Sequence, residues 1–238
     1  MSNAIILDCT LRDGGYCNQW TFGEKNIKKI ILELIHADVD IIECGFLTER
    51  IKHKPDITKF NAIDELKDFI PKDKQDKLFV IMANSGEYSF DKLPNATDAC
   101  LDGIRLAFHK KDIEQAFREA EIIKDKGYKL FLQPMVSLNY TDEEFITLLK
   151  KSNDLEPYSF YIVDSFGAMK REELLRLFYL VEHNLKSNVK IGFHGHNNLQ
   201  LAYSNAQTLM EIPTVGDLLI DSSIYGMGRG RATSIRSF

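Results

Sequence analysis

The chain has 238 residues, 44% of them hydrophobic and 27% charged, which suits one large domain with an ordinary buried core. Its formal net charge of -5 argues against general nucleic-acid binding. The four cysteines are scattered and form no C-x-x-C pair, which favours reduced thiols in a cytoplasmic protein. No apolar run reaches the ~18 residues of a membrane helix, so we expect no signal peptide and no membrane contact.

Short apolar runs alternate along the chain with amphipathic stretches. Strands are predicted at 3–8, 40–45, 78–83, 103–108, 129–135, 159–164, 189–194 and 217–222. Helices are predicted at 24–37, 60–69, 112–126, 142–152, 170–186 and 198–211, and the pattern at 84–102 is typical of a loop. The strands are nearly continuous apolar runs, which indicates a parallel sheet covered on both faces. Eight such repeats predict a closed (β/α)8 TIM barrel.

The end of the chain leaves too little length for an eighth helix after the strand at 217–222. We therefore expect one catalytic barrel domain, 1–238, whose last helix is lacking or altered and which forms the N-terminal part of a longer protein. A barrel without that helix exposes apolar surface, so we also expect a homo-oligomer.

Ionisable residues gather where predicted strands end, which is the rim at which barrel enzymes keep their chemistry. Arg12 and Asp13 follow the first strand, and His194 and His196 end the seventh. Side chains at i and i+2 of a strand share a face, so both imidazoles can reach one ion. With the Asp13 carboxylate they suit Mn²⁺ or Mg²⁺, with zinc and cobalt as alternatives. The competing interpretation is polar residues lining a wet barrel mouth, with Asp13 paired to Arg12.

The open coordination positions of such an ion suit the carboxylate and keto oxygens of a 2-oxo acid. Arg12 stays protonated at any working pH and can stabilise a developing enolate. Its alternative role is a structural salt bridge. These residues together predict a small carbonyl compound as the substrate.

The run Asp8-x-Thr10-Leu11-Arg12-Asp13-Gly14, taken with His194-x-His196, resembles the DRE-TIM metallolyase superfamily, the HMG-CoA lyase-like proteins. The segments 102–109 and 163–169 are similar to its 4-hydroxy-2-oxovalerate aldolase branch. The resemblance implies a (β/α)8 barrel and a divalent metal held by Asp13, His194 and His196. It further implies an enolate-stabilising role for Arg12 and a reaction that makes or breaks a C–C bond next to a carbonyl.

The chain departs from these relatives at their base histidine, whose position is occupied by Tyr16. A phenol is a poor base at neutral pH. His109 is a candidate substitute, or else a polar cap of its strand, so the proton-transfer group stays open between Tyr16, His109 and water. Glu43 is expected either to contact substrate or to orient Arg12. Ser165 is expected to bind substrate or to satisfy loop amides.

A second departure lies in the tail, where the relatives' Gly-x-Gly-Asn is replaced by the stretch 230–233. A reading-frame slip and a trimmed domain both explain it. The leading hypothesis is a metal-dependent aldolase that acts on a 2-oxo acid, with a partner dehydrogenase or a C-terminal module as further expected partners. An acetyl-CoA-dependent Claisen-type acyltransferase and a ligand-binding barrel without catalysis stay as alternatives.

Overall fold

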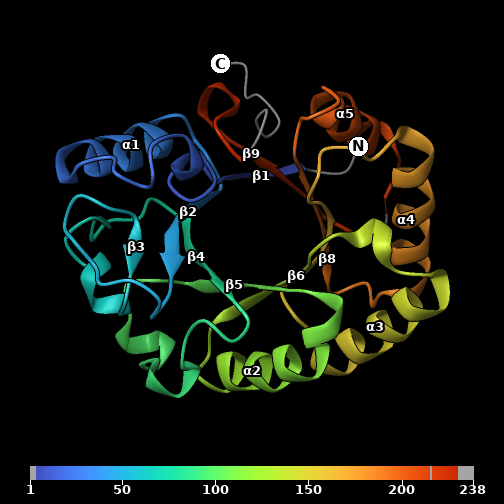
Figure 1. The fold of residues 1–238 in the computed structure, drawn as a ribbon, viewed down its shortest axis with the longest axis horizontal. Coiled ribbons are helices and arrows are strands. Elements are labelled where there is room, and N and C mark those ends of the chain that lie inside the picture. Colours follow the sequence, from blue (N-terminus) through green and yellow to red (C-terminus); the bar gives the residue numbers. More distant parts are fainter. Residues whose placement is uncertain (1–3, 215, 230–238) are drawn as a thin grey trace.

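The computed structural model describes residues 4–214 and 216–229. Within them, parallel strands form a closed barrel that is ringed by helices (Figure 1). The barrel strands are β1 (Ala4–Asp8), β2 (Ile41–Leu47), β4 (Leu78–Asn84), β5 (Gly103–Phe108), β6 (Lys129–Pro134), β7 (Ser159–Asp164), β8 (Lys190–Gly195) and β9 (Leu218–Ser222). A two-residue strand, β3 (Lys59–Phe60), pairs with β2 outside the barrel. The predicted TIM barrel is confirmed.

The first and last strands close the barrel. β1 pairs in parallel with β9 from Ala4↔Leu218 to Asp8↔Ser222, and its far side pairs with β2 at Leu7↔Ile41 and Asp8↔Ile42. The loops that follow β1 and β9 therefore lie next to each other at the C-terminal rim. This neighbourhood brings the two ends of the sequence into one site.

The outer ring consists of α1 (Glu24–His36), α2 (Ile113–Asp125), α3 (Asp142–Leu155), α4 (Arg171–Asn184) and α5 (Ala202–Glu211). Each matches a predicted helix, and Thr141 caps α3 by accepting a hydrogen bond from the Glu144 backbone amide. Short 3-10 helices complete the described elements: η1 (Gly14–Cys17), η2 (Ile63–Leu66), η3 (Phe90–Lys92), η4 (Ala96–Asp98), η5 (Lys110–Asp112), η6 (Ser137–Asn139) and η7 (Ile224–Gly226).

The helix predicted at 60–69 was wrong, because this crossover folds as β3 and the single turn η2. Phe60 pairs with Leu47 in the sheet, which holds the start of the segment extended. The Glu65 carboxylate accepts hydrogen bonds from the backbone amides of Asn61 and Ala62 at 2.7 and 3.2 Å, which closes a tight turn. Tertiary pairing therefore overrides the helical periodicity here.

The barrel interior changes character along the strands. Near the N-terminal ends it is apolar, and buried Ile41, Phe131 and Leu219 belong to one cluster there. Two residues further along the same faces, Glu43 and Asp221 are also fully or almost fully buried. The interior therefore carries a charged layer directly below the rim.

Among the described residues, none of the helices is both long and apolar enough to cross a membrane. The expectation of a missing or altered last helix, like the two explanations of the tail, concerns residues 230–238, which lie outside the described part of the chain.

Candidate metal and active site

The turn after β1 presents Arg12 and Asp13 to the barrel mouth. Their backbone amides donate hydrogen bonds to the carbonyl of Cys9 at 3.1 and 2.7 Å, so the chain makes a helical turn as soon as the strand ends. The indole Nε1 of Trp20 donates to the Arg12 carbonyl at 2.7 Å and fixes this turn from the outside. Both side chains are buried.

Thr10 explains why the motif begins with Asp8-x-Thr10. The Asp8 carboxylate accepts hydrogen bonds from the Thr10 amide at 2.9 Å and from its hydroxyl at 3.1 Å. The same hydroxyl oxygen accepts a bond from the Ile224 amide at 2.8 Å, in the loop after β9. Thr10 therefore ties the loop that carries Arg12 and Asp13 to the loop at the other end of the chain.

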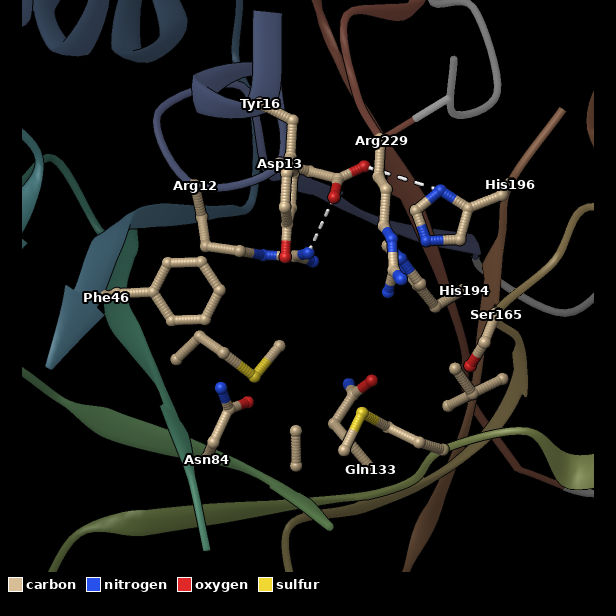
Figure 2. A pocket seen from close by; sticks show the side chains of 14 residues that line it. Arg12, Asp13, Tyr16, Phe46, Asn84, Gln133, Ser165, His194, His196 and Arg229 are labelled. Carbon is tan, nitrogen blue, oxygen red and sulfur yellow. Dashed lines mark hydrogen bonds and ion pairs between the residues drawn. The ribbon is translucent and has the colours of Figure 1, made fainter. Parts of the chain in front are cut away.

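His194 is the last residue but one of β8 and His196 follows the strand, and the two rings lie 5.0 Å apart between centroids. One potential ligand atom from each of Asp13, His194 and His196 lies within 4.8 Å of the other two. Figure 2 shows the His196 ring beside the Asp13 carboxylate, to which a dashed line joins it, at the edge of the pocket that His194 also lines. The structure therefore brings together the three residues that the sequence motif predicted as metal ligands.

The two imidazoles are prepared to act as ligands. Burial, together with nearby His194, lowers the pKa of His196 to about 4, so this ring is neutral at pH 7. Its Nδ1 is buried, has no hydrogen-bond partner among the described residues, and lies 3.8 Å from Asp13 Oδ2. His194 Nδ1 instead lies 2.7 Å from Asp221 Oδ2, which leaves its Nε2 as the ligand atom. A carboxylate, a neutral imidazole whose Nδ1 has no hydrogen-bond partner among the described residues, and a second imidazole with a free Nε2 fit a divalent cation.

Two of the three guanidinium nitrogens of Arg12 are held by carboxylates, and the third has no such partner in the described part of the chain. Its Nε donates to Glu43 Oε2 at 2.8 Å and its Nη1 to Asp13 Oδ1 at 2.8 Å. Burial alone would lower the pKa of Arg12, but Glu43 and Asp13 raise it above its ordinary value, so the guanidinium stays charged. Its Nη2 is buried and has no hydrogen-bond partner among the described residues. Arg12 therefore offers a fixed cationic hydrogen-bond donor beside the possible metal ligands Asp13, His194 and His196.

A buried chain of charges links Arg12 to His194 from below. Glu43 has no exposed surface and pairs with Arg105 Nη1 at 2.9 Å as well as with Arg12. The other end of the Arg105 guanidinium pairs with Asp221, the carboxylate that holds His194. Of the two roles expected for Glu43, the structure places it where it orients Arg12, since it does not line the pocket.

Asp221 keeps its charge inside the barrel. Burial alone would raise the pKa of this carboxyl, but Arg105 and His194 hold it at about 2. The ionised Asp221 can only accept a hydrogen bond, so the Nδ1 of His194 carries a proton and donates this hydrogen bond, which fixes the orientation of the ring. Arg105 and Asp221 were not predicted as site residues, although a charge inside an apolar strand is itself a signal, because buried charges must be paired.

The pocket at the barrel mouth encloses about 460 Å³, counting its opening. Arg12, Asp13, His194 and His196 line one side, and the apolar side chains of Met82, Met135 and Val163 are also part of its lining. Arg229 points into the same pocket from the segment after β9, and its guanidinium lies 5.8 Å from the centre of the Tyr16 ring (Figure 2). This second arginine was not among the site residues predicted from the sequence.

The remaining predicted site residues divide into two groups. Tyr16 and Ser165 line the pocket, and the Ser165 hydroxyl also accepts a hydrogen bond from the Val136 amide at 2.9 Å. His109 is exposed after β5 and lines a neighbouring hollow with Met135 and Asn139. His109 is therefore not brought together with the cluster, whereas Tyr16 is.

A closed barrel with a carboxylate, two imidazoles and a fixed arginine at its C-terminal mouth defines the class of metal-dependent barrel proteins. The sequence model of the HMGL-like family matches residues 3–235, and the chain belongs to that family.

Two curated relatives match across nearly all of the chain. It is 25% identical to 4-hydroxy-2-oxovalerate aldolase 6 of Rhodococcus jostii (strain RHA1), over 96% of this chain and 64% of that protein. It is 24% identical to an oxaloacetate decarboxylase of Mycobacterium tuberculosis, over 95% of this chain and 66% of that protein. The chain thus spans about two thirds of the length of these relatives.

Solved structures show the same fold. The N-terminal domain of a proposed aldolase from Bacteroides vulgatus superposes with a TM-score of 0.77 at 29% identity, over 97% of this chain and 76% of that one. An HMG-CoA lyase from a Bacillus species superposes with a TM-score of 0.70 at 14% identity, over 95% and 78% of the two chains. At that low identity the second likeness supports the fold alone.

Proposed function

We propose that this barrel is a divalent-metal-dependent aldolase that cleaves or forms the C–C bond next to the carbonyl of a 2-oxo acid. The observation that carries the proposal is the unoccupied donor of Arg12, held in one pocket with Asp13, His194 and His196. The names of the curated relatives, an aldolase and a decarboxylase of oxo acids, support the same reaction class.

Asp13, His194 and His196 would hold the cation, with Mn²⁺ or Mg²⁺ as the expected metals. When bound, such an ion polarises a carbonyl oxygen as a Lewis acid. The protein prepares for it by keeping the His196 ring neutral through burial, while the Asp221 contact orients His194 and leaves its Nε2 free. The His196 ring therefore needs no deprotonation at neutral pH.

The bond cleavage follows from the positions of the charged groups. In a 4-hydroxy-2-oxo acid, the C4 hydroxyl loses its proton, the C3–C4 electron pair moves toward the C2 carbonyl, and an aldehyde and an enolate result. Arg12 Nη2 donates to the developing enolate oxygen, which is worth about 10²–10³ in rate for a preorganised donor. Protonation of the enolate at C3 then gives the second product, a 2-oxo acid.

We assign the positioning of the C4 hydroxyl to Tyr16, because Tyr16 lines the pocket and His109 does not. The Tyr16 side chain is 42% exposed at the mouth, so the hydroxyl proton has a route to solvent water. Ser165 and Arg229 line the same pocket and would bind the substrate carboxylate.

The test is pyruvate release from 4-hydroxy-2-oxopentanoate with Mn²⁺, compared with the same assay after chelation. We expect metal-dependent turnover that falls by about 10²-fold or more in Arg12→Gln. Arg176→Gln, on the outer helix α4, is the matched control and should stay within twofold, about the effect of removing an exposed ion pair. Thiol release from acetyl-CoA with 2-oxo acids, without aldol cleavage, would identify an acyltransferase, and metal binding without either reaction would identify a non-catalytic barrel.

A further inference from the structure

A second hollow opens beside the metal pocket and shares three lining residues with it, namely Tyr16, Phe46 and Asn84. Trp20, Ile51 and Lys59 are among its other lining residues. We call the hollow formed by Tyr16, Trp20, Phe46, Ile51 and Lys59 the side chamber. It encloses about 580 Å³, counting its open mouth, so it has room for a six-membered ring.

The inner wall of the side chamber is held in place at a conformational cost. Trp20 and the residue before it, Gln19, both adopt left-handed backbone angles, with φ of 61° and 58°. Such conformations in non-glycine residues cost about 1–3 kcal/mol each and gather at functional sites. The strain turns the indole against Gly15, where any Cβ would collide with it, and toward Tyr16, whose ring centroid lies 4.6 Å away.

The outer wall comes from the excursion between β2 and β4. Gly45, at φ of 142°, lets Thr58 approach so closely that a Cβ at position 45 would collide with the Thr58 carbonyl oxygen. This approach places Lys59 over the indole, with Nζ 3.3 Å from the centre of the Trp20 ring. Partial burial also lowers the pKa of Lys59. The lysine therefore completes the wall, and its ammonium group makes a cation–π contact with the indole face.

The charges of the side chamber favour an uncharged occupant. Arg50 Nη1 forms an ion pair with Glu87 at 3.1 Å, and the Lys59 ammonium group lies against the indole. The inner surface is formed by the rings of Tyr16, Trp20 and Phe46, with the latter two 5.9 Å apart between centroids. Aromatic walls of this kind gain most from burying an aryl or branched alkyl group.

We propose that the side chamber binds the aryl or branched alkyl substituent carried by the aldehyde half of the substrate. The proposal rests on the proposed function for the position of the reacting bond, because the metal pocket takes the 2-oxo acid half. The substituent at C4 then extends past Tyr16 and Phe46, the side chains that separate the two spaces. Tyr16 thereby helps to select the C4 substituent, at the position where the relatives carry a histidine.

The kinetic test compares two 4-hydroxy-2-oxo acids, one with a methyl and one with a phenyl group on C4. We expect wild-type kcat/KM to favour the phenyl substrate by about 10-fold or more, as apolar pockets discriminate by the area they bury. Ile51→Asp places a charge at the chamber wall and should remove most of that preference by lowering kcat/KM for the phenyl substrate. Leu32→Asp, on α1 and 46% exposed, is the matched control and should keep the preference.

A second measurement does not depend on catalysis. Trp20 is the only tryptophan of the chain, so its fluorescence reports the chamber directly. We expect benzyl alcohol to change its emission saturably, in wild type and Leu32→Asp but not in Ile51→Asp, and ethanol to leave it unchanged. A saturable response without any aldol cleavage would sustain the chamber and overturn the proposed function. Aldol cleavage with no phenyl preference and no fluorescence response would overturn the chamber alone.

Discussion

Arg105 offers the sharpest test of how the site is held together. Its side chain has no exposed surface, and it joins Glu43, the partner of Arg12, to Asp221, the partner of His194. Arg105→Met keeps an unbranched apolar stem but leaves two buried carboxylates without their shared cation. Removing one partner of a buried ion pair costs about 3–5 kcal/mol, so we expect the free energy of unfolding to fall by at least that amount.

The assay is urea denaturation at pH 7, followed by Trp20 fluorescence. Lys74→Met is the matched control, because Lys74 pairs with Asp102 in a partly exposed position, at 2.8 Å, and its loss should cost about 1 kcal/mol or less. The free energies of unfolding of wild type and Arg105→Met should also approach each other at acidic pH. The folded pKa of Asp221 is about 2, below its unfolded value, so its ionisation stabilises the fold above pH ~4, and this contribution is lost as the pH falls toward 2.

The variant has lost the main group that lowers this pKa, so its Asp221 is protonated at higher pH and gives up less on acidification. The gap between the two unfolding free energies should therefore narrow below pH ~4. Equal urea midpoints for wild type and Arg105→Met at pH 7 would refute the view that this arginine supports the charged layer.

Three further outcomes are expected. Asp221→Asn should weaken Mn²⁺ binding by about 10–100-fold in calorimetric titration, because the amide no longer fixes the imidazole tautomer; unchanged affinity would contradict the assigned role. Arg229→Met should raise KM for the 2-oxo acid by about 10-fold or more with a smaller change in kcat, as expected for a lost charged hydrogen bond, and an unaltered KM would remove Arg229 from the substrate site. Gly45→Ala should lower the free energy of unfolding by about 2 kcal/mol or more in urea, since its φ of 142° is strained for alanine and its Cβ meets the Thr58 carbonyl; Gly216→Ala, whose Cβ has its nearest contact at 3.8 Å, is the control.

The barrel could be predicted from the sequence because its strands are continuous apolar runs, a pattern that follows from burial on both faces. The crossover after β2 could not, because its conformation depends on Phe60 turning back to pair with Leu47, at the end of β2. Local periodicity carries no information about such a partner. The cluster of Asp13, His194 and His196 was predictable because its signal is local. Histidines at i and i+2 of an extended segment share a face, and Asp13 lies in the turn that follows the first strand.

The supporting residues of the site were the harder part. Arg105 and Asp221 stand in strands whose other residues are mostly apolar, and the sequence alone does not say which buried charge pairs with which. Arg229 lies in a glycine-rich segment, and only the closure of β1 against β9 brings it to the same mouth as Asp13. Their roles depend on contacts between distant parts of the chain, which spacing cannot encode.

The pairing of β1 with β9 also determines when, during synthesis, the barrel can close and the cation site can form. Ala4 lies beside Leu218, so the barrel cannot close on the ribosome until almost the whole described chain has been synthesised. Asp13 is synthesised well before His196, so the cation site is completed only after the segment that carries both histidines has been made. A metal that binds the closed barrel but not the open chain stabilises it by mass action. Ion uptake thereby favours chains that have finished folding.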